Sequence, residues 1–304
     1  MMFRTILVSG ALMVGAAAAA DPVFVGPVEA GQLAAPPRLE TSGFAASQRD
    51  PGILWTHDDS GGAASLYAVK TTGELVGELR IDGTINVDWE DLASFVRDGK
   101  PWLLIGDTGD NRAQRGTILL HIVAEPAIAG FATKHKLHVS PARTLRVRYE
   151  DGPRDCESVA VDPAEGAIYL LSKRDDVKRL YRVELEPKNT GQVLVAQRVG
   201  LVEYLPQATA AQRGIKGYLG RRRAEATAMD FTADGTAALV LTYGDLLLFV
   251  RRGREPGAST LSRPPIALPG HGLIQAEAAC FSTDGNHIYV AAEGSRELLR
   301  YDRK

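Results

Sequence analysis

The chain has little cysteine and no strong excess of either charge, which excludes several protein classes. Only Cys156 and Cys280 occur in 304 residues, so a disulfide framework is excluded, and no C-x-x-C pair indicates a redox or zinc site. Both cysteines lie in apolar strand-like runs, which favours buried thiols. The formal net charge is −2, whereas nucleic-acid binding requires a basic face, so we expect no nucleic-acid partner.

Long apolar runs are absent beyond the N-terminus. Arg4 supplies a positive start, residues 5–20 are mostly small or apolar, and five alanines precede Asp21. This stretch of about sixteen residues is short of the ~20 needed to span a bilayer, and its small-residue end is typical of a cleaved signal peptide. We predict a signal peptide over 1–20, with a membrane anchor as the alternative. The mature chain, 21–304, is then periplasmic or secreted and has no transmembrane segment.

Sustained helical periodicity is scarce, and we expect one helix, within 209–219. Short apolar runs bounded by turn residues dominate instead, which is typical of strands. The clearest runs are 53–56, 102–105, 168–171, 238–242 and 287–291. Many short strands with few helices predict an all-β sandwich, barrel or propeller.

A four-residue unit precedes each of these runs and indicates internal repetition. Each unit has an acid or hydroxyl, a small or polar residue, and two mostly apolar residues. The units begin at Ser42, Glu90, Glu157, Glu225 and Glu277. Their spacing of roughly 50 to 70 residues suits propeller blades of ~40–50 residues with inserted loops near 125–145 and 200–222. We predict one five-bladed β-propeller, with six blades as the alternative, closed by a strand from 23–38.

The repeated acids predict a metal site on the propeller axis. The first strand of every blade lines the central channel, so Ser42, Glu90, Glu157, Glu225 and Glu277 are expected to converge. Clustered carboxylates repel one another unless they are protonated or bridged by a cation. Oxygen ligands without Cys or His select a hard cation, and Ca²⁺ accepts six to eight oxygens in flexible geometry. The alternative is that these are ordinary glutamates at strand starts.

Polar residues also follow the second strand of each repeat, which returns to the same face. We take Asp59, Asp107 and Asp110 as candidate catalytic residues, because a carboxylate can accept a proton. The candidate substrate-binding residues, which could hold an anion or donate hydrogen bonds, are His57, Arg112, Lys173 and Arg174. The alternatives are turn formation for the aspartates, solvated charge for the basic residues and a structural histidine. The sequence contains no nucleophile elbow, Walker loop or dinucleotide fingerprint.

Four short windows resemble secreted calcium-dependent propellers, namely the calcium-activated nucleotidases (apyrases), the phytases and phytase-like esterases. The windows are 40–44, 90–93, 156–160 and 276–280, and the apyrase layout is the most similar. The resemblance implies five blades around an axial calcium with a ring of serine and glutamate. The chain departs from that pattern at Glu225, where the family has a hydroxyl, and it lacks a clear counterpart of the nucleotide-binding loops.

Two functions follow from these features. The first is a calcium-binding scaffold in the cell envelope that binds a ligand or an envelope protein. The second is a calcium-dependent hydrolase of phosphate esters or anhydrides, whose substrate would be a phosphorylated small molecule. Fold alone does not choose between them.

Overall fold

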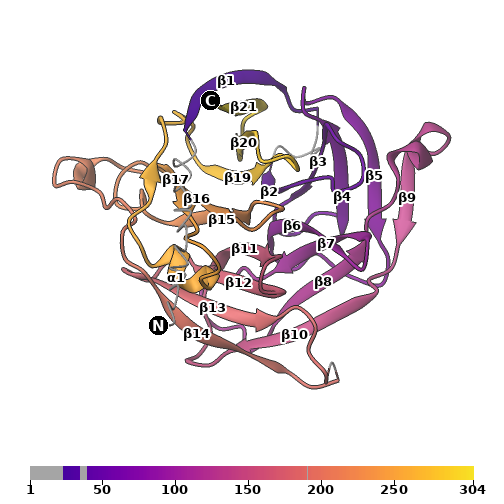
Figure 1. Ribbon diagram of the computed structural model, residues 1–304, viewed down its shortest axis with the longest axis horizontal. Coiled ribbons are helices and arrows are strands. Elements are labelled where there is room, and N and C mark those ends of the chain that lie inside the picture. Colours follow the sequence, from indigo (N-terminus) through magenta and orange to yellow (C-terminus); the bar gives the residue numbers. More distant parts are fainter. Residues whose placement is uncertain (1–22, 35–39, 190) are drawn as a thin grey trace, which may run out of the picture.

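The computed structural model describes residues 23–34, 40–189 and 191–304. Strands make up nearly all of its regular structure, and they are arranged around a common centre (Figure 1). The first half of the chain supplies β1 (Phe24–Gln32), β2 (Thr41–Ala46), β3 (Ile53–Asp58), β4 (Ser65–Lys70), β5 (Leu75–Ile81), β6 (Trp89–Arg97), β7 (Lys100–Asp107), β8 (Ile118–Ala124), β9 (Lys136–Val139) and β10 (Arg143–Tyr149). The second half supplies β11 (Cys156–Asp162), β12 (Ala167–Ser172), β13 (Lys178–Glu184), β14 (Leu194–Val202), β15 (Ala226–Phe231), β16 (Ala237–Thr242), β17 (Leu246–Val250), β18 (Ile266–Ala267), β19 (Ala276–Phe281), β20 (His287–Ala292) and β21 (Glu297–Arg303).

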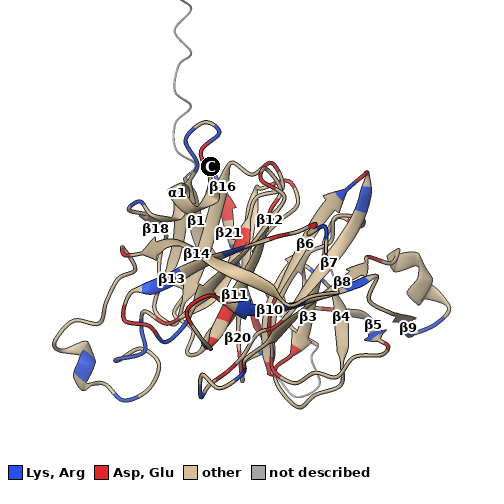
Figure 2. Cartoon of the chain, turned by 90° about the horizontal axis from the view of Figure 1, so that it is seen from below, with Lys and Arg blue, Asp and Glu red and all other residues tan. Residues whose placement is uncertain are grey.

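Parallel pairing of β10 with β14 joins two units into one eight-stranded sheet, and β9 adds a fifth strand to another unit. Within these sheets the strand order divides into four-stranded units, here called blades 1 to 5. They are β2–β5, then β6–β7–β8–β10, then β11–β14, then β15–β18, and finally β19–β20–β21 with β1. The first strands of neighbouring blades pack side by side in the cyclic order β2, β6, β11, β15, β19 and back to β2. Figure 2 shows the blades side-on, with loops at both faces. The predicted all-β propeller is confirmed.

The ring is completed by the N-terminal strand. Strand β1 pairs antiparallel with β21, from Phe24 opposite Arg303 to Gln32 opposite Glu297. Pairing of the two ends of the chain within one sheet covers an edge that would otherwise be free to pair with another molecule. The predicted signal peptide and residues 35–38 of the predicted closing segment lie outside the described residues. Within the described residues, no helix has the length and apolar character needed to cross a membrane.

Apolar side chains fill the space between each pair of neighbouring blades. Trp55 and Trp89 are fully buried between blades 1 and 2, and Tyr169 packs on Phe231 between blades 3 and 4 at 5.8 Å between ring centroids. Both faces of the second strand of each blade are therefore covered, which explains the continuous apolar runs of β3, β7, β12, β16 and β20 in the sequence.

Two aspartates, the fully buried Asp91 and the partly buried Asp230, link inner strands that do not pair in a sheet. The Oδ2 atom of Asp91 accepts the backbone N–H groups of Val159 at 2.8 Å and Met229 at 3.1 Å, so one carboxyl group connects blades 2, 3 and 4. Asp230 Oδ2 likewise accepts the N–H of Phe281 at 2.9 Å. Inner strands diverge where they surround the axis, and these carboxyl groups satisfy amides that would otherwise be buried without a partner.

The sequence placed the strands better than it placed the helix. All five predicted runs lie within β3, β7, β12, β16 and β20. The helix expected within 209–219 is wrong, because this segment contains only a short 3₁₀ turn, Gln212–Gly214. The described residues contain one α-helix, α1 (Gly257–Leu261). The insertion near 125–145 adds β9, which pairs parallel with β5 at the outer edge of blade 1.

Candidate metal centre

Each inner strand has a β-bulge close to its start, and this bulge defines equivalent positions in the five blades. In β11, Cys156 is opposite Ser172 and Ser158 is opposite Leu171, which leaves Glu157 as the extra residue. The same register shift occurs in the other four inner strands. A bulge bends the strand and redirects a side chain. The bulged residues are Gly43, Glu90, Glu157, Thr227 and Glu277.

This register corrects two of the five predicted metal ligands. Ser42 precedes the bulge of blade 1, and its hydroxyl donates to the backbone oxygen of Glu90 at 2.6 Å. Glu225 lies two residues before the bulged Thr227, and its Oε2 accepts Arg222 Nε at 2.8 Å. The comparison of the repeated units missed these two positions because the bulged residues there, Gly43 and Thr227, are not acidic. Thr227, which carries a hydroxyl, occupies the bulged position of blade 4.

The three remaining glutamates meet around one buried lysine. Glu90, Glu157 and Glu277 are only 5–6 % exposed, and the Lys173 ammonium forms an ion pair with Glu157. Lys173 also lies 4.9 Å from the centre of the Tyr243 ring, and the Tyr243 hydroxyl donates to Glu277 at 2.9 Å. Lys173 was predicted to bind substrate, but its burial at 2 % exposure makes it an internal counter-ion.

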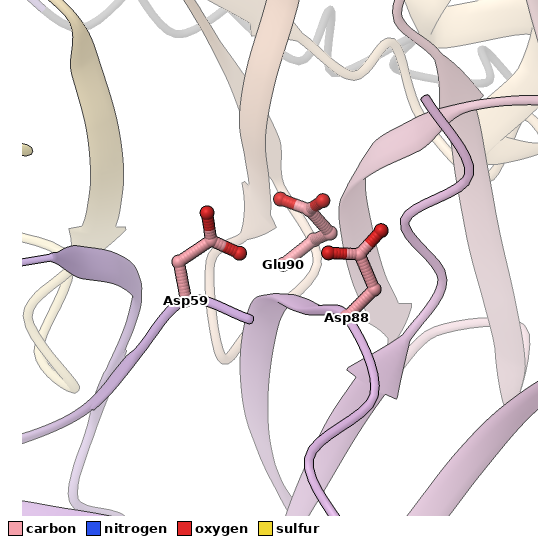
Figure 3. A group of neighbouring side chains, drawn as sticks. All are labelled: Asp59, Asp88 and Glu90. Carbon is pink, nitrogen blue, oxygen red and sulfur yellow. The ribbon is translucent and has the colours of Figure 1, made fainter. Parts of the chain in front are cut away.

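Two overlapping carboxylate groups form the candidate metal centre. Asp59, Asp88 and Glu90 place one oxygen each within 4.8 Å of the others, and so do Glu90, Asp155 and Glu157. Figure 3 shows the first group, whose carboxylates point toward one another. Glu90 belongs to both groups. The five carboxylates come from the loop after β3 and from the start of β6 and β11, so they join blades 1, 2 and 3.

The electrostatics of the cluster favour uptake of positive charge. Burial raises the pKa of Glu157 to about 8 even though Lys173 opposes the shift, and burial also raises the pKa of Asp59 to about 6. The pKa of Glu90 lies well above its ordinary value because of burial and the neighbouring Glu157 carboxylate. Raised pKa values show that these carboxylates favour the uptake of a proton or of another cation.

Gly109 allows Asp88 and Glu90 to come together. A Cβ atom at this position would lie 2.2 Å from Glu90 Oε1 and 2.4 Å from Asp88 Oδ2. The glycine backbone therefore forms one wall of the carboxylate cluster, and any side chain there would displace both acids. The ligands are all oxygen atoms, which fits a hard cation. Because Ca²⁺ accepts six to eight oxygens in a flexible geometry, Ca²⁺ fits the cluster better than Mg²⁺ does.

The predicted catalytic and substrate-binding residues are not equally accessible. His57 is fully buried, its Nδ1–H donates to the Asp58 carbonyl at 2.9 Å, and burial lowers its pKa to about 4. Asp107 is also fully buried and pairs with Arg115 at 2.8 Å. Neither side chain reaches solvent in this structure, so substrate binding by His57 and proton transfer by Asp107 stay predictions from the sequence.

The remaining predicted residues lie in loops at this face. Asp110 is 5 % exposed, and its oxygens accept the backbone N–H groups of Gln114 and Arg115 at 2.8 and 2.7 Å. Its side chain holds the loop in this way, and its catalytic role stays a prediction from the sequence. Arg112 is exposed. Arg174 pairs with Asp155, and among the predicted bases only Asp59 belongs to a carboxylate group of the centre.

Sequence reasoning missed Asp88 and Asp155. Each lies two residues before a bulged glutamate, at the position that Glu225 has relative to Thr227. An acid two residues before the repeated unit was thus a usable sequence pattern. It identifies Asp88 and Asp155, which lie beside the bulged glutamates and which the four-residue unit does not include.

Comparisons with known proteins add little to this description. No protein-family model matches the chain, and no curated protein matches it. Among solved structures, a chain of a mitotic checkpoint complex matches at 13 % identity and a TM-score of 0.39, covering 85 % of this chain and 60 % of that one. A proposed gluconolactonase matches at 12 % identity and 0.47, covering 88 % and 76 %. The Dos1 propeller matches at 10 % and 0.38, covering 86 % and 68 %. The fold assignment rests on the strand topology.

Proposed function

We propose that this protein is an exported calcium-binding β-propeller that serves as a scaffold for a ligand or partner in the cell envelope. The observation that carries the proposal is the pair of overlapping carboxylate groups centred on Glu90. Export to the periplasm or beyond rests on the N-terminal sequence, and it would place the site where Ca²⁺ is more abundant than in the cytoplasm.

The chain's own residues define what the site does. Asp59 approaches from blade 1, Asp88 and Glu90 belong to blade 2, and Asp155 lies at the start of blade 3. A cation held among them neutralises carboxylates that otherwise repel, and it ties three blades together at one face. Lys173 balances part of the charge of Glu157 and Glu277, so the cation would be held by Glu90, with Asp59 and Asp88 on one side and Asp155 on the other.

Calorimetric titration of the mature chain with CaCl₂ and, separately, MgCl₂ tests the proposal. We expect tight binding of Ca²⁺, weaker binding of Mg²⁺, and a rise in melting temperature that a chelator reverses. Glu90→Gln removes the carboxylate shared by both groups and should weaken Ca²⁺ at least ~10-fold, equivalent to about 1.4 kcal/mol. Glu184→Gln changes an exposed carboxylate at the end of β13 and serves as the matched control. Equal affinity in all three proteins would refute the site.

One observation favours the alternative, a calcium-dependent phosphohydrolase. Asp59 combines a pKa of about 6 with membership of the metal group, and a base with a pKa near the working pH is suited to accept a proton from water. A bound cation would supply polarisation of a phosphoryl oxygen. Phosphate release from a nucleotide, phytate and a simple ester should then require Ca²⁺ and be lost in Asp59→Asn. Calcium binding without phosphate release from any of the three substrates would contradict the hydrolase and favour the scaffold.

A further inference from the structure

Arg174 and a metal ion compete for the same carboxylate. Both oxygens of Asp155 have partners: Oδ1 accepts the backbone N–H of Asp110 at 2.9 Å, and Oδ2 contacts Arg174 Nε at 2.5 Å. Asp155 is 4 % exposed, so water reaches the pair only from the side of Arg174. The same residue belongs to the group with Glu90 and Glu157 that is able to hold a cation. A divalent ion on Asp155 would therefore lie next to the Arg174 guanidinium, and the two positive charges would repel each other.

The Arg174 guanidinium has other polar partners within reach once it leaves Asp155. Arg174 is 37 % exposed at its side chain, it already donates to Asn111 Oδ1, and its Nη1 lies 3.9 Å from Glu225 Oε2. It lines a small cleft of about 150 Å³ between blades 2 and 3, together with Asn111, Pro153, Arg154 and Asp175 among others. Release from Asp155 leaves the guanidinium in this cleft, beside the cation.

Uptake of a cation makes the cleft less negative. Its charged lining consists of Asp110, Asp155, Asp175, Arg154 and Arg174, which is three acids against two bases. A divalent ion on Asp155 offsets this excess of acid, although Glu90 and Glu157 of the same group share its charge. Arg154 remains paired with Asp175 at 3.2 Å, so Arg174 is the guanidinium left to bind an anion. A guanidinium matches the planar or tetrahedral oxygens of such a group through paired hydrogen bonds.

We propose that Arg174 is a built-in competitor for the cation at Asp155, and that its displacement forms a binding site for an oxyanion between the cation and the guanidinium. This inference rests on the proposed calcium site and assigns the chemical class of ligand that the site binds. Binding of the cation favours binding of the oxyanion, because the cation displaces Arg174 from Asp155 and the released guanidinium binds the oxyanion. Thermodynamic linkage requires the effect to be reciprocal.

Calorimetry on the full mature chain tests this with CaCl₂ as the cation and sodium sulfate or sodium acetate as the probe anions. Arg174→Gln should bind Ca²⁺ about tenfold more tightly than the native protein, because a competing positive charge is gone. In the native protein, saturating sulfate or acetate should tighten Ca²⁺ by at least ~5-fold, and this effect should vanish in Arg174→Gln. Arg146→Gln, at an exposed arginine on β10, is the matched control and should behave as the native protein.

The outcomes separate the two proposals. Absence of Ca²⁺ binding in the native protein refutes the calcium site itself. Calcium binding that Arg174→Gln leaves unchanged or weakens shows that Arg174 is no competitor, and the inference fails while the calcium site stands. Coupling that persists in Arg174→Gln, or that neither anion produces, overturns the oxyanion site. Coupling to acetate alone assigns a carboxylate ligand, and coupling to sulfate alone assigns a tetrahedral oxyanion.

Discussion

Replacement of Gly109 by alanine is the sharpest test of the metal centre, because one methyl group meets two of its ligands. The new Cβ would be 2.2 Å from Glu90 Oε1 and 2.4 Å from Asp88 Oδ2, whereas nonbonded heavy atoms settle at ~3.5–4 Å. Both carboxylates must retreat by roughly 1 Å. The Ca²⁺–oxygen distances tolerated in proteins span only ~2.3–2.6 Å, so both oxygens leave the coordination shell.

Loss of two charged ligands should raise the Kd for Ca²⁺ at least ~100-fold, equivalent to about 2.7 kcal/mol. In the native protein, Ca²⁺ at 100 times Kd adds ~2.7 kcal/mol of stability, which corresponds to a rise in Tm of roughly 5–10 °C for a domain of this size. The Gly109→Ala protein should show almost none of this rise at the same concentration. Isothermal titration and thermal unfolding measured with and without a chelator supply both numbers.

The control lies in the same loop. Gly116 has no heavy atom within 4 Å of an added Cβ, and neither glycine has a positive φ, so alanine strains the backbone at neither site. Gly116→Ala should retain native affinity and the full calcium-dependent rise in Tm. If Gly109→Ala folds, as judged by circular dichroism, and binds Ca²⁺ as tightly as the native protein, then Asp88 and Glu90 do not share a cation.

Two further predictions follow from the buried acids. The folded-state pKa values of Asp59 (about 6) and Glu157 (about 8) exceed the unfolded values of ~4, so the calcium-free protein loses stability as pH rises from ~4 to ~8. Calcium binding releases those protons, and its affinity should therefore increase over the same interval; a flat calorimetric profile would contradict this. Asp91→Ala removes the acceptor of the Val159 and Met229 amides, and leaving each unsatisfied costs about 1–3 kcal/mol. Denaturant unfolding should show a loss of roughly 2–6 kcal/mol, with Asp91→Asn losing less, and an unchanged free energy of unfolding would show that the carboxyl group does not join the blades.

The sequence by itself determined the strands, their repetition and the propeller. These depend on local properties: apolar runs that are buried on both faces, and turn residues between them. Glycine and aspartate at the hairpin turns, as in 233–235 and 283–285, set strand ends without reference to the rest of the chain. The acidic starts of β6, β11 and β19 were also visible, which is why Glu90, Glu157 and Glu277 were found.

Only the tertiary structure decided which acids meet. A β-bulge adds one residue to a strand, and it therefore changes which side chain faces the axis without changing composition or hydrophobic pattern. Ser42 lies one residue and Glu225 two residues before the bulge of its blade, so neither occupies the axial position. Only closure of the ring brings Lys173 next to the glutamates and places Asp59 and Asp155 beside Glu90. Distances between side chains on different blades arise from closure of the ring, and no local stretch of sequence contains them.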